Sequence, residues 1–135
     1  RKAGVAPGVI GRVVHATTLF TNALIERKGA RTALLTTAGF EDSLEIGRER
    51  KYELYDIFIE MPRPLVPRPW RRGVAERLAA DGSVERALDL DAALREVAAL
   101  VAEGVESLAV CLLHAYANPA HERAIAEAVA KRFPA

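Results

Sequence analysis

The stretch DAALREVAALVAEGVESLAVCLLH, residues 91–114, determines the fold class of this chain. Its first half places apolar residues at i, i+3, i+4 and i+7 from Leu94, which predicts an amphipathic helix over 91–103 with an aspartate as N-cap and Gly104 as terminator. The continuous apolar run that follows predicts a strand over 105–114 that is covered on both faces, as in a parallel or mixed sheet. A helix that leads into a buried strand indicates an α/β fold, a mixed sheet with flanking helices.

Three further elements are predicted in the N-terminal third of the chain. Thr17 or Thr18 can cap a helix that Gly29 would end as a left-handed residue. A strand follows over 30–37, because a short apolar run precedes a glycine turn there. A short helix is expected over 40–48.

The C-terminal half adds a hairpin and a last helix. Two short alternating runs, 74–78 and 84–88, flank Asp81-Gly82, and a D-G dipeptide between such runs predicts a two-stranded ribbon. Asn118 as N-cap and Pro119 at the first helical position predict the start of the last helix. Seven residues on the apolar sides of these elements are expected to share one core: Leu34, Leu94, Val97, Val110, Leu112, Ile125 and Val129.

Length and composition narrow the functional classes. The 135 residues fit one domain, are 50% hydrophobic and have a net charge of +1. Disorder, a membrane span and a nucleic-acid or membrane-surface partner are therefore not expected. The one cysteine, Cys111, cannot form an internal disulfide and lies in an apolar run, which predicts a buried thiol and a reducing compartment. Since the chain starts at Arg1 without an initiator Met, we expect a processed chain or an excised fragment.

Polar residues gather at the start of the first predicted helix. His15, Thr17, Thr18 and Asn22 place hydroxyls, an amide and an imidazole where free N–H groups and the helix dipole favour a phosphate or a carboxylate. The structural alternative is ordinary capping by one of the threonines together with a buried, hydrogen-bonded His15. Spacing alone leaves both interpretations open.

A second cluster, His114, His121 and Glu122, lies between the predicted strand over 105–114 and the last helix. Two neutral imidazoles and a carboxylate can hold a metal ion. However, neighbouring residues on a helix point in different directions, and the Asn-Pro cap already explains the local sequence. No metal site is predicted.

Four arginines surround Trp70, and they can be interpreted in two ways: Arg63, Arg68, Arg71 and Arg72. A nucleic-acid patch with an aromatic platform is one interpretation, and the net charge of +1 argues against it. The four prolines among them instead predict an extended connector without regular structure, whose arginines are solvated or paired with acidic residues. Glu45 and Arg48, one helical turn apart, are expected to form a weak ion pair.

Several longer motifs follow one another in the chain: HATTLFTNALIERKG at 15–29, ARTALLTTAGF at 30–40, LEIGR at 44–48 and VCLLHAYANPAHE at 110–122. With shorter matches they extend in order over residues 9 to 133. Their order and spacing resemble the N-terminal region of the hydantoinase A/5-oxoprolinase family.

This resemblance implies a fragment of an actin-like, ribonuclease H-like ATPase fold. It also implies an origin in a cytoplasmic ATP-dependent hydrolase that opens cyclic amides such as hydantoin or 5-oxoproline through a phosphorylated intermediate. ATP and Mg²⁺ would serve the full-length enzyme, and a hydantoinase B-type subunit or fused domain would be its partner. We expect His15 and Asn22 to orient the cyclic amide or its intermediate, and Thr17 and Thr18 to bind phosphate oxygens.

Two departures from the family pattern limit these expectations. Family members usually begin with an Asp-x-Gly-Gly-Thr phosphate loop, and no such motif precedes His15, so residues 1–135 are expected to form one domain that is inactive alone. Ala16 stands where the family usually has Gly, which bears on a close backbone approach of a ligand. The alternative is a structural or partner-docking module of a related ATP-dependent carboxylase subunit.

Overall fold

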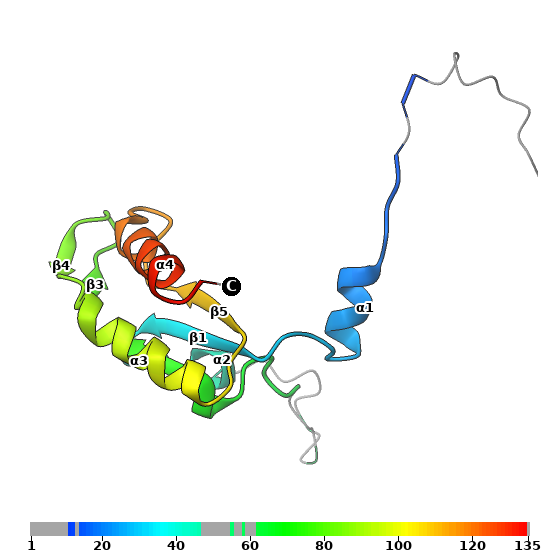
Figure 1. The fold of residues 1–135 in the computed structure, drawn as a ribbon, viewed down its shortest axis with the longest axis horizontal. Coiled ribbons are helices and arrows are strands. Elements are labelled where there is room, and N and C mark those ends of the chain that lie inside the picture. The colour runs from blue at the N-terminus through cyan, green and yellow to red at the C-terminus, as the bar shows by residue number, and fades with distance from the viewer. Residues whose placement is uncertain (1–10, 13, 47–54, 56–57, 59–61, 135) are drawn as a thin grey trace, which may run out of the picture.

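A three-stranded parallel sheet forms the centre of the computed structural model, which describes residues 11–12, 14–46, 55, 58 and 62–134. Its strand order is β2-β1-β5 (Figure 1), where β1 is Thr32–Thr37, β2 is Arg71–Val74 and β5 is Ser107–Cys111. In the register of the sheet, Leu34 of β1 lies beside Arg71 on one edge and Ala109 on the other. The predicted α/β class is confirmed, and this sheet is parallel throughout.

Two long helices, α3 (Leu90–Ala102) and α4 (Ala120–Arg132), cover one face of the sheet. α3 begins at Leu90, one residue before the predicted range, and an aspartate caps it as predicted, since the Asp89 carboxylate accepts a hydrogen bond from the backbone N–H of Ala92 at 2.8 Å. The chain turns after it at Gly104, whose φ of +86° suits a residue without a side chain. α4 begins one residue later than predicted, because its N-cap is Pro119 and not Asn118.

The core lies between this face and the two helices. Ala33 and Leu35 of β1 are fully buried there, whereas Leu34 points to the opposite face, as the alternation of a strand requires. The prediction that Leu34 belongs to the core is therefore wrong. Of the other predicted residues, Val97, Leu112 and Ile125 belong to the cluster, Val110 and Val129 pack against it, and Leu94 is buried outside it.

A second, two-stranded antiparallel sheet lies beside the first one. Its strands are β3 (Arg77–Leu78) and β4 (Val84–Arg86), which confirms the predicted ribbon in a shorter form. In the turn, the Asp81 carboxylate accepts hydrogen bonds from the Ser83 hydroxyl and backbone N–H, and these bonds lower the pKa of Asp81.

The segment around Trp70 is more regular than predicted. A 3-10 turn, η2 (Arg68–Trp70), leads directly into β2, so the predicted irregular stretch ends in a strand. The four β2 residues have no local alternation of their own, and their pairing with β1 is a long-range contact. Sequence patterning detects strands by that alternation and misses this one.

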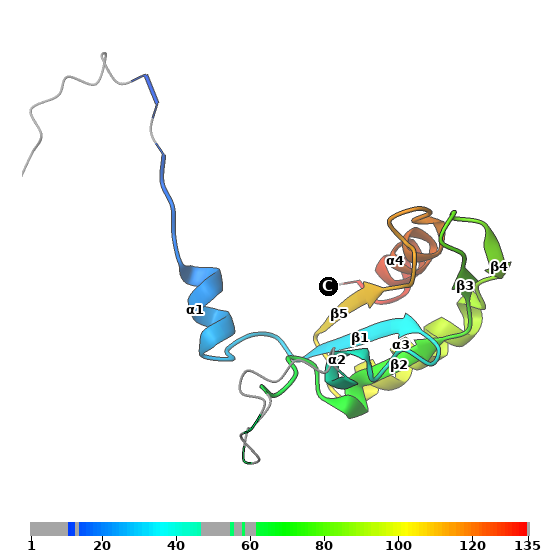
Figure 2. The same ribbon diagram turned by 180° about the vertical axis from the view of Figure 1, so that it is seen from behind.

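Two short helices, α1 (Leu19–Ile25) and α2 (Ser43–Ile46), complete the fold. Figures 1 and 2 both show α1 set apart from the body made by the sheet, α3 and α4. α2 lies within the predicted range 40–48, of which residues 47 and 48 lie outside the described chain.

The chain after α1 turns at Arg27 and not at Gly29, so the predicted terminator is wrong. Arg27 has a φ of +52°, and its guanidinium donates hydrogen bonds to the carbonyl oxygens of Arg63 at 2.7 Å and Pro64 at 3.4 Å. These long-range bonds hold a conformation that a non-glycine residue rarely adopts.

The sheet face opposite α3 and α4 is only partly covered. On β5 the side chains of Ser107, Ala109 and Cys111 point to this face and are exposed, whereas Leu108 and Val110 pack against the core. We call this side the open face. Within the described residues, the prediction of cover on both faces is therefore wrong, and so is that of a buried Cys111. No helix in the described ranges is long and apolar enough to cross a membrane.

Truncation of Leu112, which is 5% exposed and belongs to the core cluster, should cost about 2–5 kcal/mol of unfolding free energy. Leu65, at 66% exposure, is the matched control, and Leu65→Ala should change the stability by less than about 0.5 kcal/mol. Urea denaturation of Leu112→Ala and Leu65→Ala measures both. Equal losses would place Leu112 outside the core.

Candidate functional site

The four predicted site residues lie at and just before α1, and all are exposed. The backbone N–H of Asn22 bonds to the Thr18 carbonyl oxygen at 2.8 Å, so these two residues are one helical turn apart, as expected. Thr18 occupies the N-cap position without a side-chain bond, and Thr17 instead accepts from the N–H of Leu19 at 3.3 Å. The alternative of a buried His15 is wrong, and the proposed roles of the four residues stay predictions.

A groove of about 580 Å³ lies between α1 and the start of the sheet. Phe20, Ala23 and Leu24 line it from α1, and Thr32 and Ala109 line it from the open face. His15, Thr17, Thr18 and Asn22 are not among its lining residues. The predicted site residues are therefore accessible to a ligand, but they do not converge on this groove.

A dense polar network occupies the opposite end of the sheet, where the three parallel strands end. The carboxylate of Glu76 is fully buried, accepts a hydrogen bond from the Thr37 hydroxyl, and lies 2.8 Å from Nδ1 of His121. Nδ1 is the ring nitrogen of His121 that makes this contact, and Nε2 takes no part in it. The three residues join the ends of β1 and β2 to the first turn of α4.

The same network holds the chain that leaves β5. The Thr37 hydroxyl oxygen accepts from the N–H of Leu113 at 3.0 Å, and the Glu122 carboxylate accepts from the N–H of Leu112 at 2.9 Å. His114, just beyond, has a φ of +58°, and its Nδ1 lies 3.3 Å from the Tyr116 hydroxyl.

His114, His121 and Glu122, considered above as a metal-ligand set, therefore have three different partners and do not converge. No group of three or more His, Cys, Asp or Glu side chains in the described ranges is placed to hold a metal ion.

Sequence reasoning missed Thr37 and Glu76. Thr37 was part of a predicted strand, but a threonine there gives no sign of a buried polar network. Glu76 follows β2, which the sequence did not reveal, and its partner His121 is 45 residues away. The only available signal was the position of Thr37 at the end of a predicted strand, because open α/β sheets bind ligands at strand ends.

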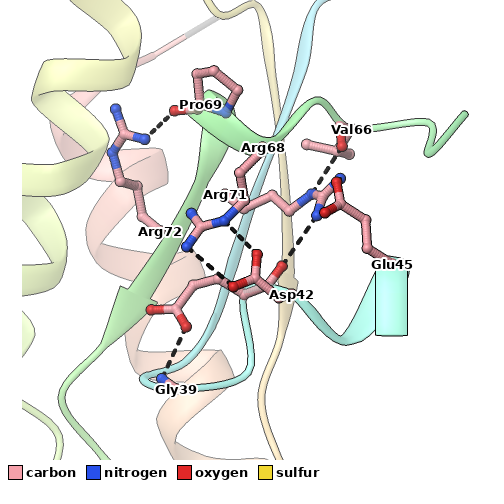
Figure 3. Close-up of polar contacts among 9 residues, drawn as sticks. Gly39, Asp42, Glu45, Val66, Arg68, Pro69, Arg71 and Arg72 are labelled. Carbon is pink, nitrogen blue, oxygen red and sulfur yellow. Dashed lines mark hydrogen bonds and ion pairs between the residues drawn. The ribbon is translucent and has the colours of Figure 1, made fainter. Parts of the chain in front are cut away.

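Arg68, Arg71 and Arg72 near Trp70 are paired with acidic residues, as one of the expected alternatives states. Figure 3 shows Arg68 beside Asp42 and Arg71 beside Glu45. Arg71 is fully buried, and its guanidinium donates to the Val66 carbonyl oxygen at 2.9 Å and to the Glu45 carboxylate at 2.9 Å. Arg68 pairs with Asp42. The expectation of a solvated arginine is therefore wrong for Arg71.

Two further ion-pair results bear on the sequence predictions. Arg72 contacts Glu96 at 3.2 Å and Glu103 at 2.9 Å, both on α3. Glu45 takes Arg71 as its partner, and the expected partner Arg48 lies outside the described residues. Because carboxylates pair with the guanidinium groups of Arg68, Arg71 and Arg72, these arginines do not form a free basic patch.

Comparison with known proteins gives a family match over nearly the whole chain. Residues 1–133 match the family described as hydantoinase/oxoprolinase N-terminal region. The acetophenone carboxylase gamma subunit of Aromatoleum aromaticum is 35% identical over 88% of this chain and 17% of its own length. 5-oxoprolinase 1 of Arabidopsis thaliana is 33% identical over 78% of this chain and 10% of its own length.

A solved structure agrees with these matches. The crystal structure of ATP-dependent caprolactamase from Pseudomonas jessenii is 36% identical and superposes with a TM-score of 0.73 over 85% of this chain and 17% of that protein. The chain spans between 10% and 18% of the length of the curated relatives that it matches best.

Loss of the Glu76 carboxylate should strongly destabilise the fold, because it would leave the buried Thr37 hydroxyl and His121 without their partner. We expect Glu76→Ala to cost about 3–5 kcal/mol. The matched control is Glu85→Ala, since Glu85 is largely exposed and lies 3.8 Å from Arg77, and we expect it to change stability by about 0–1 kcal/mol. Chemical denaturation of both variants is the measurement, and similar losses would show that the network does not stabilise the sheet end.

Proposed function

The chain belongs to the hydantoinase/oxoprolinase N-terminal family, and we propose that it forms one domain of an ATP-dependent hydrolase that opens cyclic amides such as hydantoin or 5-oxoproline. The observation that carries this proposal is the family match over residues 1–133, in agreement with the caprolactamase fold. The relatives named 5-oxoprolinase and caprolactamase are both named for cyclic amide substrates.

The chemistry of a cyclic amide explains why such a hydrolase would use ATP. Amide resonance makes the carbonyl oxygen nucleophilic and leaves the ring carbon unreactive. Phosphorylation of that oxygen makes the carbon open to attack by water. Because the sequence has no Asp-x-Gly-Gly-Thr phosphate loop, we assign ATP and Mg²⁺ to other parts of the longer enzyme.

Within this chain, we assign the contacts with substrate to the polar stretch before and along α1. His15 and Asn22 would orient the cyclic amide or its phosphorylated intermediate, and Thr17 and Thr18 would donate to phosphate oxygens. The exposure of all four side chains supports this assignment, as does the single helical turn between Thr18 and Asn22.

A second subunit or a fused domain is the proposed partner. Relatives of this chain are named as subunits of caprolactamase, acetophenone carboxylase and acetone carboxylase, which supports action within an assembly. We propose a hydantoinase B-type partner, on whose side water opens the activated ring, and a cytoplasmic location.

A carboxylase subunit is the second candidate function. The 35% identity to the acetophenone carboxylase gamma subunit favours it, and the chain would then support the enzyme or dock its partner without touching substrate. The exposed apolar residues of α1, among them Phe20 and Ile25, fit such a docking role.

Substrate tests on the longer protein with its partner separate the two functions. We expect ATP-dependent ring opening of at least one of three substrates, namely a hydantoin, 5-oxoproline or caprolactam. Mass spectrometry of the opened product detects the reaction. ATP-dependent incorporation of labelled bicarbonate into a ketone, with no ring opening, would favour the carboxylase. If the protein acts on both cyclic amides and ketones, the class with the higher kcat/KM identifies the function.

Replacement of Thr18 or Asn22 by alanine should lower kcat and kcat/KM of the longer enzyme together, by about 10²–10³, if each donates a contact made mainly in the transition state. A capping role predicts a loss of about 1 kcal/mol in stability with unchanged turnover of the folded enzyme. Kinetics and thermal melting of Thr18→Ala and Asn22→Ala distinguish these outcomes. Ser43→Ala, an exposed change on α2, is the control for both measurements.

The 135-residue chain alone should neither bind nor hydrolyse ATP, because its sequence has no Asp-x-Gly-Gly-Thr loop to hold the phosphates. Calorimetric titration with ATP and Mg²⁺ checks this, with the longer enzyme titrated under the same conditions as positive control. A micromolar Kd for the chain alone would contradict the assignment of ATP to other parts of the enzyme.

A further inference from the structure

We propose that the outer edge of β5 binds one further β-strand, supplied by the polypeptide that precedes α1 in the longer protein, and that α1 packs across the open face. The inference goes beyond the proposed reaction. It requires only that the chain is part of a longer polypeptide, whatever that polypeptide catalyses.

The open face of β5 has the composition of an interior surface. Its exposed side chains, Ser107, Ala109 and Cys111, are small and uncharged. The exposed side of α3 and α4 is instead rich in charge: Arg95, Glu103, Arg123, Glu127, Lys131 and Arg132. A surface that stays in contact with water is expected to carry many charged residues, as the exposed side of α3 and α4 does.

The free edge of β5 gives a second, independent indication. Among the described residues, β5 pairs only with β1, so its outer edge has no strand beside it. Natural proteins protect water-exposed edges with lysine, proline or a bulge, and Ser107–Cys111 has none of these. Parallel sheets are moreover almost always covered on both faces. The outer edge of β5 therefore has the features of an edge that pairs with a further strand and is buried.

α1 supplies apolar cover for this side of the sheet. Phe20 and Leu24, one helical turn apart on α1, are 75% and 41% exposed, an unfavourable arrangement for a helix in water. Phe20, with Ala23 and Leu24 of the same helix, already faces the open face across the groove. Packing of α1 over this face would bury both apolar surfaces at once.

The handedness of parallel crossovers identifies the position of the added strand. The connection from β2 through α3 to β5 crosses β1 on the helix-covered face. Crossovers between parallel strands are right-handed in about 98% of cases. A crossover of the same hand on the opposite face must run across the sheet in the opposite direction, from the β5 side toward β2.

α1 leads directly into β1, so a crossover through α1 on the open face must start from a strand on the β5 side of β1. β5 already occupies the position next to β1 on that side, so the added strand must pair with the outer edge of β5. The strand that precedes α1 therefore belongs there. The caprolactamase polypeptide is much longer than this chain, which spans only 16–17% of it.

Cys111 is a natural probe of this surface, because its thiol lies on the open face of β5 and is exposed in the chain alone. Labelling with a maleimide, followed by mass spectrometry of the peptide that contains Cys111, should be at least about tenfold slower in the native longer polypeptide than in the 135-residue chain. The matched control is Ala99→Cys, on the exposed side of α3, which should react at similar rates in both proteins.

Three results would overturn the proposal. Equal labelling of Cys111 in both proteins would show that the face stays open. Protection in the 135-residue chain that rises with concentration, together with a dimer mass by light scattering, would make a second copy the occupant. Protection that appears only after a separate subunit is added would assign the surface to that subunit.

Truncation tests the origin of the strand. A longer polypeptide shortened to begin at Leu19, the first residue of α1, should label Cys111 as fast as the 135-residue chain, with retained amide protection of β1 as the check on folding. Slow labelling in a folded truncated protein would place another segment on the edge. If the truncated protein does not fold, amide exchange in the intact polypeptide decides, because slow exchange must appear both in Ser107–Cys111 and in a segment before α1.

Discussion

The parallel pairing of β1 with a strand on each edge is the constraint on which the rest of the described structure depends. Because β2 and β5 both run parallel to β1, neither can be reached by a tight turn, and each requires a long connection. α3 lies in the connection between β2 and β5 and buries Val97 and Leu100 against the β1 residues Ala33 and Leu35. The same pairing brings three strand ends together, where Thr37, Glu76 and the chain after β5 meet.

The buried guanidinium of Arg71 explains why one half of the open face is closed. Arg71 points to that face from β2, and a charge there requires partners because its desolvation is unfavourable. The Glu45 carboxylate and the carbonyl oxygens of Glu41 and Val66 supply them, which draws α2 and the segment before η2 onto the sheet. β5 has no such residue, and its half of the face stays exposed.

Two polar regions lie at opposite ends of the sheet and are separate sites. The stretch from His15 to Asn22 lies before and along α1, which leads into the amino end of β1. The Thr37–Glu76–His121 network lies at the carboxyl end of that strand, and a six-residue strand spans roughly 20 Å. The network joins the ends of β1 and β2 to α4, whereas the side chains of the stretch before and along α1 are exposed.

The sequence by itself determined the elements whose signals are local. The helical spacing from Leu94, the Asp89 and Gly104 boundaries of α3 and the D-G turn at Asp81 all depend on neighbours within a few residues, and the structure contains each of them. The order of motifs likewise identified the family. Tertiary structure alone decided that β2 exists, that Glu76 meets His121, that Arg27 adopts a positive φ and that Cys111 is exposed. The physical reason is that each of these depends on groups tens of residues away, or on what covers a face, and neither periodicity nor composition records such contacts.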